Sequence, residues 1–88
     1  IRLPVPPLSE ERRHDLVKAA RTKAEDAKVA VRNVRRHSKD QIKTTQTDEN
    51  LQEDMRYEAE DQLQKMTDDH VQRIESLMEH KQSEIMEV

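Results

Sequence analysis

The apolar positions of the chain follow a helical period from residue 16 to residue 42. Small and apolar side chains recur there every three or four positions, which places them within an arc of about 80° on a helix. Because most of these side chains are small, we expect a second helix to approach this face closely. The positions are Leu16, Ala20, Ala24, Ala27, Val31, Val34, Ser38 and Ile42.

A second apolar stripe of the same kind runs from residue 51 to the end of the chain. Residues 44–50, TTQTDEN, separate the two stripes with β-branched and turn-favouring polar residues, which predicts the loop there. Two helices over about 9–44 and 51–87 would then form an antiparallel hairpin. The second stripe consists of Leu51, Met55, Ala59, Leu63, Met66, His70, Ile74, Leu77, Lys81, Ile85 and Val88, widened by Val71 and Met78.

The expected helix starts carry recognisable capping residues. Ser9 is a good N-cap for the first helix, because its hydroxyl can accept from a free amide of the first turn. Asn50 with Glu53 predicts a capping box for the second helix, with Thr47 and Asp48 as alternative caps.

Residues 1–8 contain three prolines and no helical pattern. Pro4, Pro6 and Pro7 fix their own backbone angles and push the preceding residues toward extended conformations. We therefore expect an extended hinge segment at 1–8, followed by a helical domain over 9–88. The lead-in also begins without Met and in mid-pattern, so we expect the chain to be a piece of a longer protein.

The composition supports an all-α fold with a thin core. The chain has no Gly, Cys, Trp or Phe and one Tyr, and it is 40% charged but only 32% hydrophobic. Without glycine, hairpin sheets and phosphate-binding glycine loops are disfavoured. Two facing stripes leave a groove open on one side. We expect a third helix, or a second copy of the isolated chain, to complete the bundle.

The net charge of -3 conceals two halves of opposite sign. Residues 1–48 carry twelve basic and seven acidic side chains, and residues 49–88 carry four basic and twelve acidic ones. Six basic side chains occupy an arc of about 100° on the first helix, beside the apolar face. Such a cluster, with Asp40 as the only acid within it, favours a polyanion partner over a solvated face or ion pairs to the second helix. The six are Lys28, Arg32, Arg35, Arg36, Lys39 and Lys43.

Other chemistry has little support in the sequence. The four histidines show no metal-ligand spacing, and the carboxylate pairs are predicted to lie on open helix surface. We therefore expect no metal, no cofactor and no enzymatic activity. No run of 18 apolar residues is present, and the first residues resemble neither a signal nor a transit peptide, so we expect a soluble protein inside a cell.

Three segments together resemble a known family: IRLPVPPLSEERR, AKVAVRNVRRHSKDQIK and LQKMTDDHVQRIESLMEHKQSEIMEV. They resemble the C-terminal half of ribosome recycling factor. The resemblance implies that the chain supplies helices two and three of a three-helix bundle, with residues 1–8 leading to a small β-rich domain. Gln52 departs from the family, which often has Ser there, and His37 stands where an acid is usual; the first change weakens the expected cap of the second helix.

The resemblance also implies a function. Family members bind the large ribosomal subunit after termination and, with elongation factor G, disassemble the post-termination complex, in a bacterial cytoplasm or an organelle. By resemblance the residues that contact ribosomal RNA are Arg32, Arg35 and Arg36, with Arg35 foremost, while Lys28, Lys39 and Lys43 join them mainly by charge. The alternative is a structural coiled-coil or helical-bundle module that binds another protein helix and no RNA.

Overall fold

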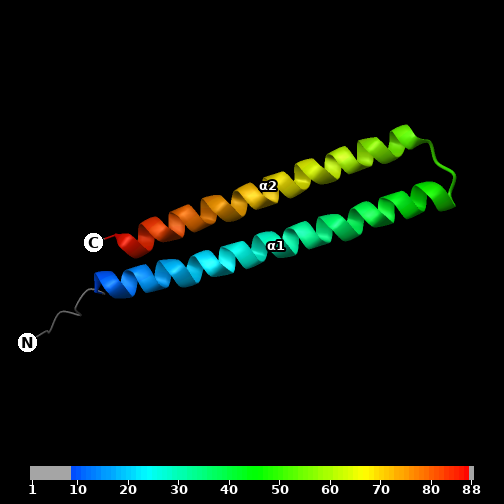
Figure 1. Cartoon of the computed structure of the whole chain (residues 1–88). Coiled ribbons are helices and arrows are strands. Elements are labelled where there is room, and N and C mark those ends of the chain that lie inside the picture. Colours follow the sequence, from blue (N-terminus) through cyan, green and yellow to red (C-terminus); the bar gives the residue numbers. More distant parts are fainter. Residues whose placement is uncertain (1–8, 88) are drawn as a thin grey trace, which may run out of the picture.

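The structure, a computed structural model, describes residues 9–87 and consists of two long antiparallel helices. Helix α1 spans Glu10–Asp48 and helix α2 spans Glu53–Met86. The helices lie side by side, so that the start of α1 and the end of α2 meet at the same end of the hairpin (Figure 1). The all-α helical hairpin is thus confirmed, and residues 9–87 contain no strand. The predicted hinge with Pro4, Pro6 and Pro7 lies outside the described residues.

The two helix starts differ in their caps. Ser9 is the N-cap of α1, and its hydroxyl accepts a hydrogen bond of 3.0 Å from the backbone N–H of Arg12, as predicted. The N-cap of α2 is Gln52, whose side chain makes no capping hydrogen bond. The predicted capping box of Asn50 and Glu53 is therefore wrong. Asn50 instead adopts a left-handed backbone with φ 52°, a conformation that Asn tolerates better than most residues.

The loop between the helices is shorter than the sequence predicts, because α1 continues through Asp48. Thr47 stays helical, and its hydroxyl donates to the carbonyl of Lys43 in the preceding turn at 3.1 Å. The side-chain amide of Gln46 then donates to the carbonyl of Leu51 at 2.8 Å, which ties the end of α1 to the chain beyond the loop. The reversal is thereby confined to residues 49–52, and the predicted loop over 44–48 is wrong.

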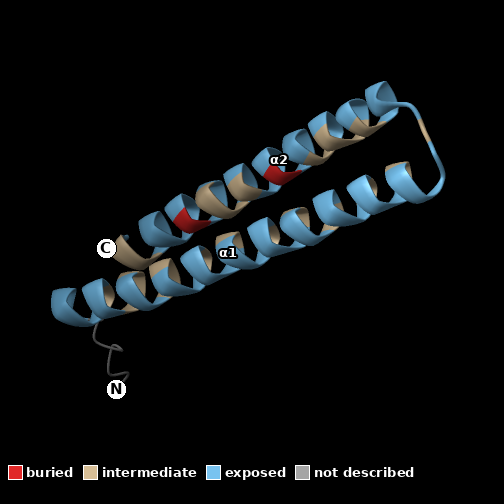
Figure 2. Cartoon of the chain, turned by 45° about the vertical axis from the view of Figure 1, so that its right-hand side comes forward, coloured by how far each residue is buried: buried red, intermediate tan, exposed pale blue. Residues whose placement is uncertain are grey.

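The hairpin is a single layer with very little buried side-chain surface. Its two short dimensions are 20 and 15 Å, which corresponds to two helices side by side. Within residues 9–87 only Met78, at 4% exposure, and Thr67 are buried, and both lie on α2 (Figure 2). The chain exposes 7529 Å². A compact monomer of 10.4 kDa would expose about 5,400 Å². The hairpin therefore exposes about 2,100 Å² more surface than a compact protein of the same mass.

The face of α1 that packs on α2 is rotated from the predicted one by about 40°. Ala27 and Val34 were expected on this face but are exposed, Val34 at 63%. Lys28 and Arg35 are partly buried in their place, because α2 offers polar partners to both. The partly buried positions of this stretch are Ala20, Arg21, Ala24, Lys28, Val31, Arg35, Ser38 and Ile42.

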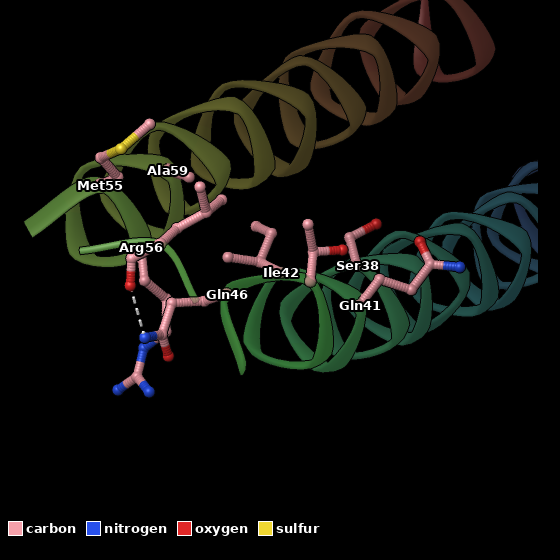
Figure 3. A pocket seen from close by; sticks show the side chains of 9 residues that line it. Ser38, Gln41, Ile42, Gln46, Met55, Arg56 and Ala59 are labelled. Carbon is pink, nitrogen blue, oxygen red and sulfur yellow. Dashed lines mark hydrogen bonds between the residues drawn. The ribbon is translucent and has the colours of Figure 1, made fainter. Parts of the chain in front are cut away.

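This rotation opens an apolar groove along one flank of the hairpin. Its rim comprises Ala27 and Val34 on α1 and Met66 and Leu77 on α2, the last two exposed at 59% and 69%. The groove continues toward the loop, where Ser38, Ile42, Met55 and Ala59 are among the residues that line a hollow of about 380 Å³ (Figure 3). Its floor is formed by Ala24, Val31, Leu63 and Ile74. Within residues 9–87, α1 and α2 both lack a continuous apolar stretch of the length that a lipid bilayer requires.

Candidate nucleic-acid interface

Four of the six predicted basic residues form an exposed row on α1. Arg32, Arg36, Lys39 and Lys43 are all exposed, and helical geometry places them within an arc of about 60° and over about 17 Å of the helix. Within residues 9–87, no ion pair joins any of them to a carboxylate. The exposed basic row therefore presents four cations on one face of α1 that make no ion pair within the described residues.

Lys28, the fifth predicted residue, is held by α2. Its ammonium Nζ lies 2.6 Å from Oε2 of Glu75 and 3.3 Å from Oε1 of Glu25, and its side chain is only 12% exposed. The hydrogen bond to Glu75 raises the pKa of Lys28, and the same bond is the main cause of the lowered pKa of Glu75. The charge of Lys28 is thus compensated within the hairpin, and the structure separates this lysine from the exposed basic row.

Arg21 shares the carboxylate of Glu75 with Lys28. Its Nη1 donates to both oxygens of Glu75, at 3.0 and 2.9 Å, and this hydrogen bonding is the main reason for the raised pKa of Arg21. Glu75 therefore joins two cations of α1 across the helix interface. Neither Arg21 nor Glu75 was predicted from the sequence. A signal was present, because Arg21, Lys28 and Arg35 are spaced seven residues apart and so lie nearly above one another on a helix.

Arg35, the sixth predicted residue, also reaches α2 but finds a neutral partner. Its Nη1 donates to Oε1 of Gln64 at 2.9 Å, and Nε2 of Gln64 donates in turn to Oδ1 of Asp68 at 2.8 Å. The Nε of Arg35 is buried and has no hydrogen-bond partner among the described residues. The guanidinium is therefore held at the edge of the interface, where it lines a hollow with Glu60 and Asp61 but makes no ion pair within the described residues. Gln64 is a further residue that was not predicted from the sequence.

Outside this surface, histidine and carboxylate side chains make short-range contacts along α2. His80 Nε2 lies 2.9 Å from Glu84 Oε1 one turn later, on exposed helix surface. Lys81 also binds Glu84, and its hydrogen bond is the main cause of the lowered pKa of that carboxyl. Within the described residues no three His, Asp or Glu side chains are grouped as metal ligands would be. The chemistry that the exposed basic row and Arg35 do offer is suited to holding a phosphate backbone by charge and hydrogen bonds.

A sequence profile and individual relatives of the chain all indicate the same protein family. A sequence profile described as ribosome recycling factor matches residues 1–86. The ribosome-recycling factors of Salinibacter ruber and Methylobacillus flagellatus are 48% and 49% identical over all 88 residues, which cover 47% and 48% of those proteins. That of Carboxydothermus hydrogenoformans is 44% identical over the same residues, 48% of its length. The chain spans about half the length of these curated relatives. Since the profile covers almost the entire chain, the chain belongs to the ribosome recycling factor family.

Proposed function

We propose that this chain is an RNA-binding part of a translation factor that recycles ribosomes. The whole factor would bind the large ribosomal subunit after termination and, with elongation factor G, disassemble the post-termination complex. The observation that carries this proposal is the exposed basic row of Arg32, Arg36, Lys39 and Lys43, found in a member of the ribosome recycling factor family. The work would be done by binding rather than by covalent catalysis, and in the cytoplasm of a bacterium or in an organelle, where such ribosomes lie.

The charges favour RNA over a protein partner for this row. Guanidinium groups can bond two phosphate oxygens at once, and exposed cations without carboxylate partners can each displace a counterion from a nucleic acid. The sole aromatic residue of the chain is Tyr57, so stacking on single-stranded bases contributes little. A straight helix that contacts the phosphates of folded RNA fits this combination best.

The experiment measures binding of the chain to purified bacterial large ribosomal subunits. We expect the double substitution Arg32→Glu, Arg36→Glu to weaken binding strongly and to flatten its salt dependence. The matched control is Lys65→Glu, Arg73→Glu, which changes the net charge equally at exposed positions of α2. Binding that falls equally in both variants, or in neither, would refute the proposed interface.

A competition experiment tests the link to recycling itself. The full-length Salinibacter ruber factor is a suitable probe, because it is 48% identical over the whole of this chain. We expect excess chain to displace that factor from large subunits and to inhibit its recycling reaction with elongation factor G. The Arg32→Glu, Arg36→Glu variant should do neither. If the chain binds subunits but leaves the recycling reaction unaffected, the proposed role is wrong although RNA binding stands.

We also propose that the isolated chain self-associates through the apolar groove. The chain exposes about 2,100 Å² more than a compact monomer of its mass, whereas a standard stable interface buries about 800 Å² on each partner. A second hairpin presents the same long apolar groove, so a two-fold pairing as a four-helix bundle would cover both. In a longer parent, the first helix implied by the family resemblance would compete for the same surface.

Sedimentation equilibrium tests this pairing. Leu77→Glu places a charge on the rim of the groove, whereas the control Gln72→Glu places it on an exposed position elsewhere on α2. We expect the unmodified chain and the control to sediment as dimers at high micromolar concentration and Leu77→Glu to sediment as a monomer. A folded, strictly monomeric unmodified chain under these conditions would contradict the pairing.

A further inference from the structure

Three basic residues of α1 reach across the same edge of the hairpin, but α2 meets them with different chemistry. Arg21 and Lys28 both bind the carboxylate of Glu75. Arg35, seven residues further along, binds the side-chain amide of Gln64. An ion pair fixes a cation and also compensates its charge, whereas an amide oxygen fixes it by a hydrogen bond and leaves the full charge in place.

The orientation of the Gln64 amide follows from its second hydrogen bond. An amide has an acceptor oxygen at one end and a donor NH2 at the other. The NH2 group of Gln64 donates to Oδ1 of Asp68, one turn later on α2, at 2.8 Å. This bond turns the oxygen of Gln64 toward Arg35, where it accepts from Nη1 at 2.9 Å. Asp68 thereby orients the amide, and Gln64 stands between that carboxylate and the guanidinium.

The bond to Gln64 orders the side chain of Arg35 before a phosphate binds. A long arginine side chain loses rotamer freedom when it binds, and ordering it beforehand reduces this cost. The bond to Gln64 occupies Nη1, so Nη2 can still donate to a phosphate oxygen. Arg35 is adjacent in sequence to Arg36 of the exposed basic row and lies about 100° from it toward α2, at the edge of the roughly 100° arc of basic residues. It can therefore extend that row to the helix interface.

We infer that Gln64 is a positioning residue for Arg35, which holds the guanidinium in place for a phosphate of RNA by a neutral hydrogen bond rather than an ion pair. This inference rests on the proposed function, since it concerns the same surface. It predicts that the carboxylate of Gln64→Glu still accepts from Arg35 but impairs the binding, because it compensates the charge of the guanidinium and cannot donate to Asp68. If Gln64 served only to hold the two helices together, Gln64→Glu would leave RNA binding unimpaired, because an arginine–carboxylate pair is the stronger bond.

The experiment compares three variants of the chain in binding to purified bacterial large ribosomal subunits. Gln64→Glu should still fold as the hairpin, because its stronger bond to Arg35 opposes the repulsion from Asp68, yet it should bind more weakly, with a slope of log affinity against log salt smaller by about 0.9. Gln64→Leu removes the acceptor and should also weaken binding. The control Gln62→Glu adds the same charge at an exposed position two residues away, and should reduce affinity much less than Gln64→Glu.

A double-mutant cycle isolates the action through Arg35. In a chain that carries Arg35→Ala, the substitution Gln64→Leu should have no further effect on affinity, and Gln64→Glu no more effect than Gln62→Glu. Equal losses with and without Arg35 would overturn the inference. If Arg32→Glu, Arg36→Glu abolishes binding while the Gln64 variants match the control, the positioning role fails and the RNA interface stands. If no variant alters binding, the interface itself fails.

Discussion

Replacing either Lys28 or Lys43 with glutamine removes one positive charge from α1, but the structure predicts opposite consequences. Both lysines belong to the basic cluster that the sequence identifies. Lys43 is exposed and has no carboxylate partner within the described residues, whereas Lys28 lies 2.6 Å from Glu75 with 12% of its side chain exposed. We expect Lys43→Gln to weaken RNA binding without affecting stability, and Lys28→Gln to lower stability without affecting RNA binding.

The size of the binding effect follows from counterion release. Each lost phosphate contact reduces the slope of log affinity against log salt by about 0.9, so that the loss of affinity between 50 and 200 mM salt shrinks by a factor of about 3.5. We expect this change for Lys43→Gln and essentially none for Lys28→Gln. The stability effect has a separate cause. Without Lys28, the carboxylate of Glu75 retains only Arg21, at 2.9 Å, as a cationic partner on α1.

The assay measures affinity for large ribosomal subunits at four or five salt concentrations, with thermal unfolding of each variant followed by circular dichroism. Because the two substitutions change the net charge equally, their long-range effects on the field of the chain are nearly matched. A reduced salt slope for Lys28→Gln as large as that for Lys43→Gln would refute the reasoning. It would mean that Lys28 leaves Glu75 to bind a phosphate.

Three further predictions concern the stability of the hairpin. Lys28 and Arg21 lower the pKa of Glu75, so the ionised carboxylate stabilises the hairpin fully above its unfolded pKa of about 4.3. This stabilisation is lost as the pH falls through the lower folded pKa. The difference in melting temperature between the unmodified chain and Glu75→Gln should therefore shrink below about pH 4. Met78→Ala should lower the free energy of unfolding in urea by about 2–3 kcal/mol, whereas Leu77→Ala at low micromolar concentration should change it by less than about 0.5 kcal/mol, since Met78 is 4% and Leu77 69% exposed. Asn50→Gly should be neutral or stabilising by differential scanning calorimetry, and Asn50→Val should cost about 1–2 kcal/mol, because the backbone at this position is left-handed.

The helical hairpin could be predicted because its information is local. Spacing of three and four residues and the hydroxyl of Ser9 specify the first helix and its start without reference to the rest of the chain. The loop was predicted less well. Thr47 has a low helix propensity, but in the structure its hydroxyl bonds back to the preceding turn while Gln46 bonds to Leu51 beyond the loop. These contacts outweigh the propensity and extend the helix.

The candidate site could be predicted only as a set of residues. Charge and spacing identify the basic cluster on α1, but they do not say which of its members remain exposed. That depends on the register of α2, which places Glu75 opposite Lys28 and Gln64 opposite Arg35. The apolar positions alone also predict a packing face that is rotated too far toward Val34. The cations that cross to α2 belong to that face as much as Ala24 and Val31 do.

The apolar groove and the exposed basic row occupy different flanks of the hairpin. On α1 the centre of Ala27 and Val34 lies about 160° from the centre of the row formed by Arg32, Arg36, Lys39 and Lys43. A helix or a second hairpin that covers the groove therefore leaves the basic row open to solvent. Bundle completion and phosphate binding can then be altered separately. Leu77→Glu should abolish pairing and preserve the RNA affinity of each chain. Lys43→Gln should preserve pairing and weaken the RNA affinity.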